Sequence, residues 1–158
     1  MAAPSGGYSL IRQGVSTSTA ITLNQVLAPA LAAIEITRAQ VSQENVTTTG
    51  QTRAQLNRNS TACTVTSATP APTGTGMQAS KCVGGTSATG ITATAEGTVT
   101  ASPWTEGFNV VNGVLYLPVP ETRWLLVGSA AGFAALKLAV APAAVTLTST
   151  MEWLEFAG

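Results

Sequence analysis

The most informative pattern along the chain is an alternation of apolar and polar side chains with the two-residue period of β-strands. Residues 32–41 place Ile34 and Ile36 on one face of such a strand and Glu35 and Thr37 on the other. The same type of pattern recurs further on, in residues 52–57, 61–67, 108–111, 114–117, 124–127, 133–140 and 145–154. Together these segments predict about eight short strands.

The competing helical pattern lies in residues 22–33, where Val26 and Leu31 belong to a set of apolar side chains at helical spacing. Pro29 interrupts this pattern, so we expect at most a short turn there. Glycine and proline separate most of the predicted strands. The sequence therefore predicts an all-β protein, built as a single-domain antiparallel β-sandwich or barrel with a short N-terminal arm.

The strongest local turn signal is Asn112-Gly113, which stands between two apolar runs. Asn-Gly favours a type I′ hairpin turn, in which both central residues adopt positive φ. We therefore predict a tight hairpin between a strand that ends at Val111 and one that begins at Val114. Gly113 should have positive φ.

Two segments differ from the predicted core. Residues 1–14 are mostly small and polar, with Tyr8, Leu10 and Ile11 as anchors. We interpret them as an arm that docks on a neighbouring molecule through these three side chains, ahead of a β-sandwich domain at residues 15–158.

The second segment, residues 73–102, is rich in Thr, Ala, Ser and Gly. It reads either as a flexible loop or as a thin β-excursion, and alternation in residues 90–97 favours the excursion. Its edge could pair with a neighbouring subunit.

The composition favours a protein that associates. Only 9% of the 158 residues are charged and the formal net charge is zero, while 45% are apolar. Typical soluble domains have about 25% charged residues. This weakly charged surface suits a subunit packed against neighbours, although a monomeric β-domain is the alternative. Because there is no basic excess, we expect no nucleic-acid binding.

No segment of the sequence has the pattern of an export signal or a membrane span. We accordingly expect no membrane partner. Cys63 and Cys82 are the only cysteines, and without an export signal we expect free thiols in preference to a disulfide.

The chain contains no histidine and no aspartate. It therefore lacks the imidazole that Ser-His-Asp and Cys-His catalysis require. The carboxylates considered for catalysis are Glu106, Glu121, Glu152 and Glu155. Their spacing does not make them converge, and the last two lie on opposite faces of one predicted strand. We expect no enzymatic activity, no cofactor and no metal.

In a chain with so few charges, each arginine should have a partner. The residues concerned are Arg38, Arg53, Arg58 and Arg123. An internal salt bridge to Glu35, Glu44 or Glu121 is one possibility, and an intersubunit bond is the other. Trp104, Trp124 and Trp153 are core or interface anchors, and Trp104 joins the interface candidates.

Several runs carry a family resemblance. They are residues 34–39, 51–58, 64–66, 106–113, 115–121, 136–139 and 151–156. Over roughly residues 30 to 157 the chain resembles structural proteins of tailed bacteriophages, and in particular the small capsid decoration, or cement, proteins. The Thr/Ala-rich residues 84–100 depart most from this pattern.

The resemblance implies a non-enzymatic virion protein that binds the outer capsid surface and stabilises the shell by bridging major capsid subunits. It would be made in the host cytoplasm and would self-associate, as a homotrimer in preference to a dimer. The alternatives are a phage tail or fibre accessory protein and, less favoured, a carbohydrate-binding β-sandwich, which would need clustered exposed aromatic residues.

Overall fold

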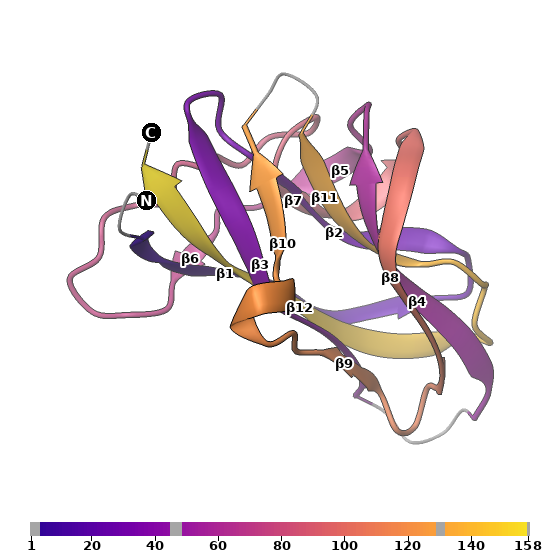
Figure 1. The fold of residues 1–158 in the computed structure, drawn as a ribbon. Coiled ribbons are helices and arrows are strands. Elements are labelled where there is room, and N and C mark those ends of the chain that lie inside the picture. The colour runs from indigo at the N-terminus through magenta and orange to yellow at the C-terminus, as the bar shows by residue number, and fades with distance from the viewer. Residues whose placement is uncertain (1–3, 45–48, 129–131, 158) are drawn as a thin grey trace.

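The computed structural model describes residues 4–44, 49–128 and 132–157, which form a sandwich of two antiparallel sheets (Figure 1). The elements are β1 Pro4–Thr17, β2 Ile21–Leu27, β3 Ala32–Gln43, β4 Gln51–Asn59, β5 Thr64–Ser67, β6 Ala71–Pro72, β7 Gly90–Ala95, β8 Val99–Asn109, β9 Val114–Tyr116, the 3₁₀ turn η1 Pro120–Thr122, β10 Trp124–Val127, β11 Phe133–Leu138 and β12 Val145–Ala157. The predicted all-β, single-domain architecture is confirmed.

The first sheet, sheet A, has the strand order β10-β3-β12-β1-β6, and β9 pairs with the same edge of β3 as β10 does. The second, sheet B, has the order β5-β7-β2-β11-β4-β8. Residues 21–27, which carried part of the competing helical pattern, form strand β2. In the described part of the chain the only helical element is η1.

The core lies between the inner faces of the two sheets. Leu147, Met151 and Trp153 alternate along β12 and are fully buried. From sheet B, Leu56 and Leu136 meet them in the same cluster. Burial of such side chains contributes about 1.5–3 kcal/mol each, so this interdigitated layer supplies most of the drive to fold.

The prediction of an N-terminal arm is wrong for the residues that the structure describes. Strand β1 pairs along its length with β12, and Pro4 lies opposite Phe156. Tyr8 and Leu10 are buried in the chain's own core, whereas Ile11 points outward and is 47% exposed. Pairing with β12 supplies the order that the small residues of this segment cannot supply themselves. The first three residues of the predicted arm lie outside the described residues.

Residues 90–95 and 99–102 lie in strands β7 and β8 of sheet B and do not form a separate excursion. Strand β7 pairs with β2 and β5, and β8 pairs with β4. Strands β4 and β5 follow each other along the chain, as do β7 and β8. Because β4 pairs with β8 and β5 pairs with β7, the four strands form one long bent antiparallel ribbon. Residues 73–89 form a loop that is fastened to sheet A, because Thr73 N donates to Gly7 O and Tyr8 Oη donates to Gln78 O, at 2.9 and 3.0 Å.

The predicted hairpin at Asn112-Gly113 is also wrong, because β8 and β9 belong to different sheets. The chain instead turns at residues 109–112, where Asn112 N donates to Asn109 O. Val110 is buried and its N–H donates to Gly50 O. These contacts place the turn two residues before the predicted hairpin turn between Val111 and Val114. Gly113 does have positive φ, at 66°, and a Cβ there would lie 2.7 Å from Val41 O.

Candidate interaction surface

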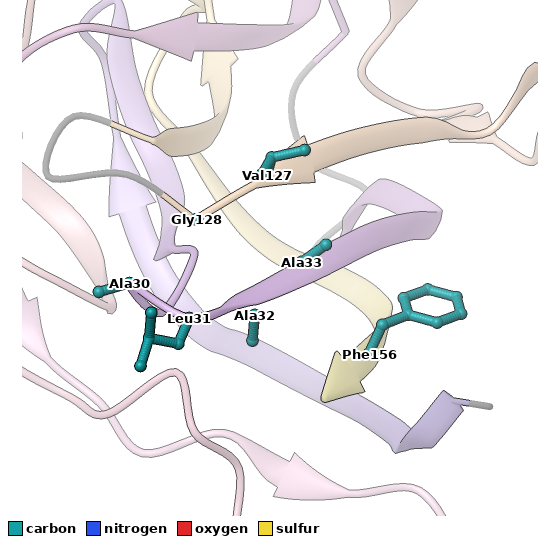
Figure 2. Close-up of a pocket in the computed structure, with 7 residues that line it drawn as sticks. All are labelled: Ala30, Leu31, Ala32, Ala33, Val127, Gly128 and Phe156. Atoms are coloured by element: carbon teal, nitrogen blue, oxygen red, sulfur yellow. The ribbon is translucent and has the colours of Figure 1, made fainter. Parts of the chain in front are cut away.

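An apolar hollow of about 310 Å³ opens at one end of sheet A (Figure 2). Val127 of β10, Ala33 of β3 and Phe156 of β12 come from three neighbouring strands of the sheet. Leu31, in the turn before β3, borders the same hollow and is 86% exposed. Every residue that lines this hollow is apolar, so its shape and hydrophobicity are suited to an apolar side chain of a partner.

Gly128 holds the hollow in shape. Its N–H donates to Ala32 O at 2.8 Å, and Ala32 N donates to Pro29 O. A Cβ on Gly128 would overlap the carbonyl oxygen of Pro29. Only glycine therefore allows the end of β10 to close against the turn that leads into β3.

The outer face of sheet A changes from apolar to polar along its strands. Beyond the hollow, Arg123 pairs with Glu35 and Arg38 pairs with Glu152, both at 3.1 Å. Further along β12 the outward side chains are threonines, of which Thr148 donates to Glu44. The apolar part of this outer face therefore ends at the two ion pairs, and the face is polar beyond them.

A second apolar feature lies on the same edge of sheet A, at the opposite end of β10 from the hollow. Residues 117–121 interrupt this edge between β9 and β10, where the 3₁₀ turn η1 stands out as an orange coil in Figure 1. Leu117 is 67% exposed and Val119 59% exposed on this segment. Thr122 N and Thr122 Oγ1 both donate to Val119 O. We call residues 117–121 the knob.

The hollow, the knob and Leu125, which lies on β10 between them, hold a large share of the exposed apolar side chains. Leu31, Leu117, Val119, Leu125 and Val127 are each more than half exposed. Exposed apolar side chains gathered in this way mark interaction sites on soluble proteins. Sequence reasoning missed this surface, since alternation shows that one face of a strand is apolar but not which apolar positions remain uncovered.

The four candidate arginines divide into two pairs. Arg38 pairs with Glu152 and Arg123 pairs with Glu35 within the chain. Of these two partners, the sequence analysis had considered Glu35. Arg53 and Arg58 are exposed on β4, and no ion pair of the described residues includes them. The third ion pair joins Lys137 to Glu96 at 3.0 Å. The intersubunit role therefore stays open only for the two arginines of β4.

The aromatic candidates lie against the body of the protein. Trp104 is half-buried on β8 and packs against Tyr116 of β9, with ring centroids 5.4 Å apart. Trp153 is fully buried beside Tyr8, and Trp124 is half-buried. These tryptophans do not form an exposed platform on which a sugar ring could stack.

Of the four carboxylates considered for catalysis, Glu155 has the most distinctive environment. It is fully buried, and Trp153 Nε1 and Lys81 N donate to it at 3.2 and 3.0 Å, as does Ser80 Oγ. Burial, with the nearby Glu155 charge, raises the pKa of the Cys82 thiol far above its usual value. Burial and the same charge also raise the pKa of Tyr8. This cluster fastens the 73–89 loop to the core.

The remaining carboxylates do not converge with it. Glu152 faces outward toward Arg38, as its opposite position on the strand predicted. Glu106 and Glu121 are exposed on β8 and η1 respectively. A pair of carboxylates suitable for general acid and base catalysis is not formed by these four side chains.

Arg12 is a buried charge that sequence reasoning missed. Its Nε donates to Thr92 Oγ1 at 2.7 Å and its Nη1 to Leu147 O at 3.3 Å. Burial lowers the pKa of Arg12, and Glu44 opposes this shift. Thr92 has a left-handed φ of 51°, which is rare for a β-branched residue. These contacts link sheet A to β7 of sheet B.

Cys63 and Cys82 are both buried free thiols, as predicted. The Sγ atom of Cys63 accepts hydrogen bonds from Gly97 N and Asn59 Nδ2, at 3.1 and 3.4 Å. Val65 and Ala93 pack beside it in a small second core inside the bent ribbon. Cys63 is thus a structural residue of sheet B.

Among residues 4–44, 49–128 and 132–157, no group of three or more His, Cys, Asp or Glu side chains is placed to hold a metal ion. These residues also contain no helix long and apolar enough to cross a membrane. Comparisons of the chain with protein-family models, with curated proteins and with solved structures find no match. The fold and the surface define the class of this protein as a β-sandwich with an exposed apolar surface on sheet A.

Proposed function

We propose that this chain is a non-enzymatic capsid decoration protein, which binds the outside of an assembled phage shell and bridges neighbouring major capsid subunits. The observation that carries the proposal is the apolar surface formed by the hollow and the knob. A free monomer gains nothing from exposing Leu31, Leu117 and Val127 together. A protein that spends its working life bound to a large surface does gain from it.

The mechanism follows from multiplicity. A shell presents many equivalent sites, so a modest contact at each copy adds up over the particle. A ligand that binds only the assembled state stabilises that state by mass action. No chemistry is needed, and this agrees with a chain that lacks histidine and aspartate.

The rigidity of the surface supports this proposal. Gly128 fixes the hollow by close backbone packing. Two hydrogen bonds to Val119 O, from Thr122 N and Thr122 Oγ1, fix the knob. Pro118 and Pro120 restrict the backbone of the knob further. A preorganised surface loses little conformational entropy when it binds.

Electron microscopy of particles made with and without this protein tests the location. Extra density on the outer shell supports decoration. Density confined to the tail supports the runner-up, a tail or fibre accessory protein, and contradicts the proposal.

A further inference from the structure

Residues 73–83, which we call the strap, are held to the sandwich by few apolar contacts. The strap is the first part of the pink loop that leaves β6 in Figure 1. Eight of its eleven residues are exposed, Met77 and Ser80 are half-buried, and only Cys82 is buried. Met77 and Cys82 are the strap residues that pack with the main core. A segment with so little buried apolar surface opens at a low cost in free energy.

Two neutral hydrogen bonds hold the first half of the strap to β1. Thr73 N donates to Gly7 O at 2.9 Å. Tyr8 Oη donates to Gln78 O at 3.0 Å, and the Tyr8 side chain is buried. Neutral hydrogen bonds each contribute only about 0.5–1.5 kcal/mol to stability, so these two are a weak attachment.

A single buried charge holds the second half of the strap. The Glu155 carboxylate of β12 accepts hydrogen bonds from Ser80 Oγ and from Lys81 N, the second at 3.0 Å. Ser80 Oγ also accepts from Cys82 N at 3.0 Å. Hydrogen bonds to an ionised acceptor are about twice as strong as neutral ones. Glu155 is therefore the main attachment of the strap.

The chain on both sides of the strap is tied to the sheets. Before it, β6 pairs with β1 of sheet A. After it, residues 84–89 lie against sheet B, where the buried Thr89 accepts a hydrogen bond from Leu27 N at 3.2 Å through its Oγ1. Gly84 and Gly85 separate this anchor from the strap, and glycine permits the backbone changes that a hinge requires. The geometry thus allows the strap to move while both of its ends stay in place.

We propose that the strap opens and closes as a unit while the sandwich stays folded, and that Glu155 holds it closed. Opening breaks the contacts described above and gives solvent access to the Cys82 thiol, the Tyr8 hydroxyl and the Glu155 carboxylate. These three side chains are buried in the closed protein. The strap is thus a lid over three titratable groups. No strap residue lines the hollow, so its opening is separate from the proposed shell binding.

The two free cysteines provide the measurement. Cys82 belongs to the strap, whereas Cys63 lies in the small second core of sheet B. Neither thiol reacts while it is buried, so the labelling rate of each one reports how often its surroundings open. The whole chain is labelled with iodoacetamide at pH 8, in urea below the unfolding transition. Mass spectrometry of the peptides then gives the two rates separately.

The urea dependence of these rates tests whether the strap opens alone. Cys82 should label at a rate that hardly depends on urea, because opening the strap exposes little surface. Cys63 should label more slowly and its rate should rise steeply with urea, because its exposure requires the sandwich to unfold. Equal urea dependence of the two rates would mean that strap and sandwich unfold together, and would overturn the proposal.

A core variant separates the two events further. Leu56 is fully buried in the main core, and Leu56→Val destabilises the sandwich whether the strap is closed or open. It should raise the Cys63 rate by about threefold or more and leave the Cys82 rate unchanged. Equal acceleration of both thiols would contradict independent opening.

Two strap variants test the role of Glu155. Glu155→Gln should raise the Cys82 rate by at least about fivefold, and Ser80→Ala should raise it as well, because each removes part of the same attachment. The matched controls Glu121→Gln and Ser87→Ala alter exposed side chains outside the strap and should leave the rate unchanged. Wild-type circular dichroism spectra would show that the variants fold. A Cys82 rate that neither strap variant raises above its control overturns the role of Glu155.

Discussion

Glu155 shows at the residue scale how a charge can serve structure alone. Three donors from Trp153, Ser80 and Lys81 converge on one buried carboxylate. Hydrogen bonds to a charged acceptor are stronger than those to a neutral one. The charge therefore holds the 73–89 loop, which has few large apolar side chains of its own.

Replacing this carboxylate by an amide should destabilise the protein. Glu155→Gln keeps the size of the side chain but removes the charge and introduces N–H groups among donors, so we expect a loss of about 1–3 kcal/mol. Urea unfolding followed by tryptophan fluorescence measures it. The control Glu121→Gln changes an exposed carboxylate and should have no effect. Equal stability of the two variants would contradict the role of Glu155.

Cys82 should make the protein sensitive to alkali. Its folded pKa is raised by burial first and then by Glu155, so the native state holds the thiol proton more tightly than the unfolded chain. The stabilisation is complete below the pKa of the unfolded thiol. It is lost as the pH rises above about 9, because only the unfolded chain then gains by ionising.

The free energy of unfolding, measured from pH 7 to 11 at constant salt, should fall above about pH 9. Cys82→Ala should flatten this dependence in part, since Tyr8 has a raised pKa and contributes with the same sign. In the native protein at pH 8, Cys82 should not react with a thiol reagent. Rapid labelling of Cys82 under those conditions would contradict the burial and the pKa shift.

At the scale of elements, strand β1 differs most from the sequence prediction. The alternation of apolar residues in β3, β10 and β12 is clear, and those strands were predicted close to their true bounds. In β1 the glycines and small polar residues hide the alternation, and the strand gains its order from β12. Pairing with a distant strand is a tertiary effect that the local sequence does not record.

The same limit explains the hairpin and the buried charges. Asn112-Gly113 has the composition of a tight turn, but the burial of Val110 moves the turn and sends β9 to the other sheet. Arg12 looks like a surface residue because its burial depends on Thr92 and Leu147, which lie far away in the sequence. Turn composition predicted the positive φ of Gly113, whereas strand pairing decided the topology.

Two neighbouring residues of β1 test its place in the core. Leu10→Ala should cost about 2–5 kcal/mol of stability, because it leaves a cavity between the sheets. Ile11→Ala should change the stability by no more than about 0.5 kcal/mol, since this side chain is largely exposed. Chemical denaturation measures both. Similar effects of the two substitutions would contradict the pairing of β1 as described.

For the whole molecule, the structure shows where the few charged residues of the sequence lie. Among the residues that the structure describes, three ion pairs join six of the few charged side chains. The hollow and the knob leave large apolar side chains in solvent, and β8 leaves an open strand edge. Composition indicated that the protein associates, but only the fold shows which residues are available for association.

The central claim is that the apolar surface of sheet A binds and stabilises an assembled shell. Shells of the major capsid protein should be heated with and without added protein, and their disruption followed by light scattering. Val127→Lys places a charge in the hollow, and Val83→Lys is its matched control on the 73–89 loop, since these valines are 62% and 66% exposed.

We predict that the wild-type protein and Val83→Lys raise the temperature at which shells break, and that Val127→Lys does not. Melting temperatures of the free proteins would show that both variants fold. Shells whose breaking temperature is unchanged by the wild-type protein, or raised equally by Val127→Lys, would contradict the account.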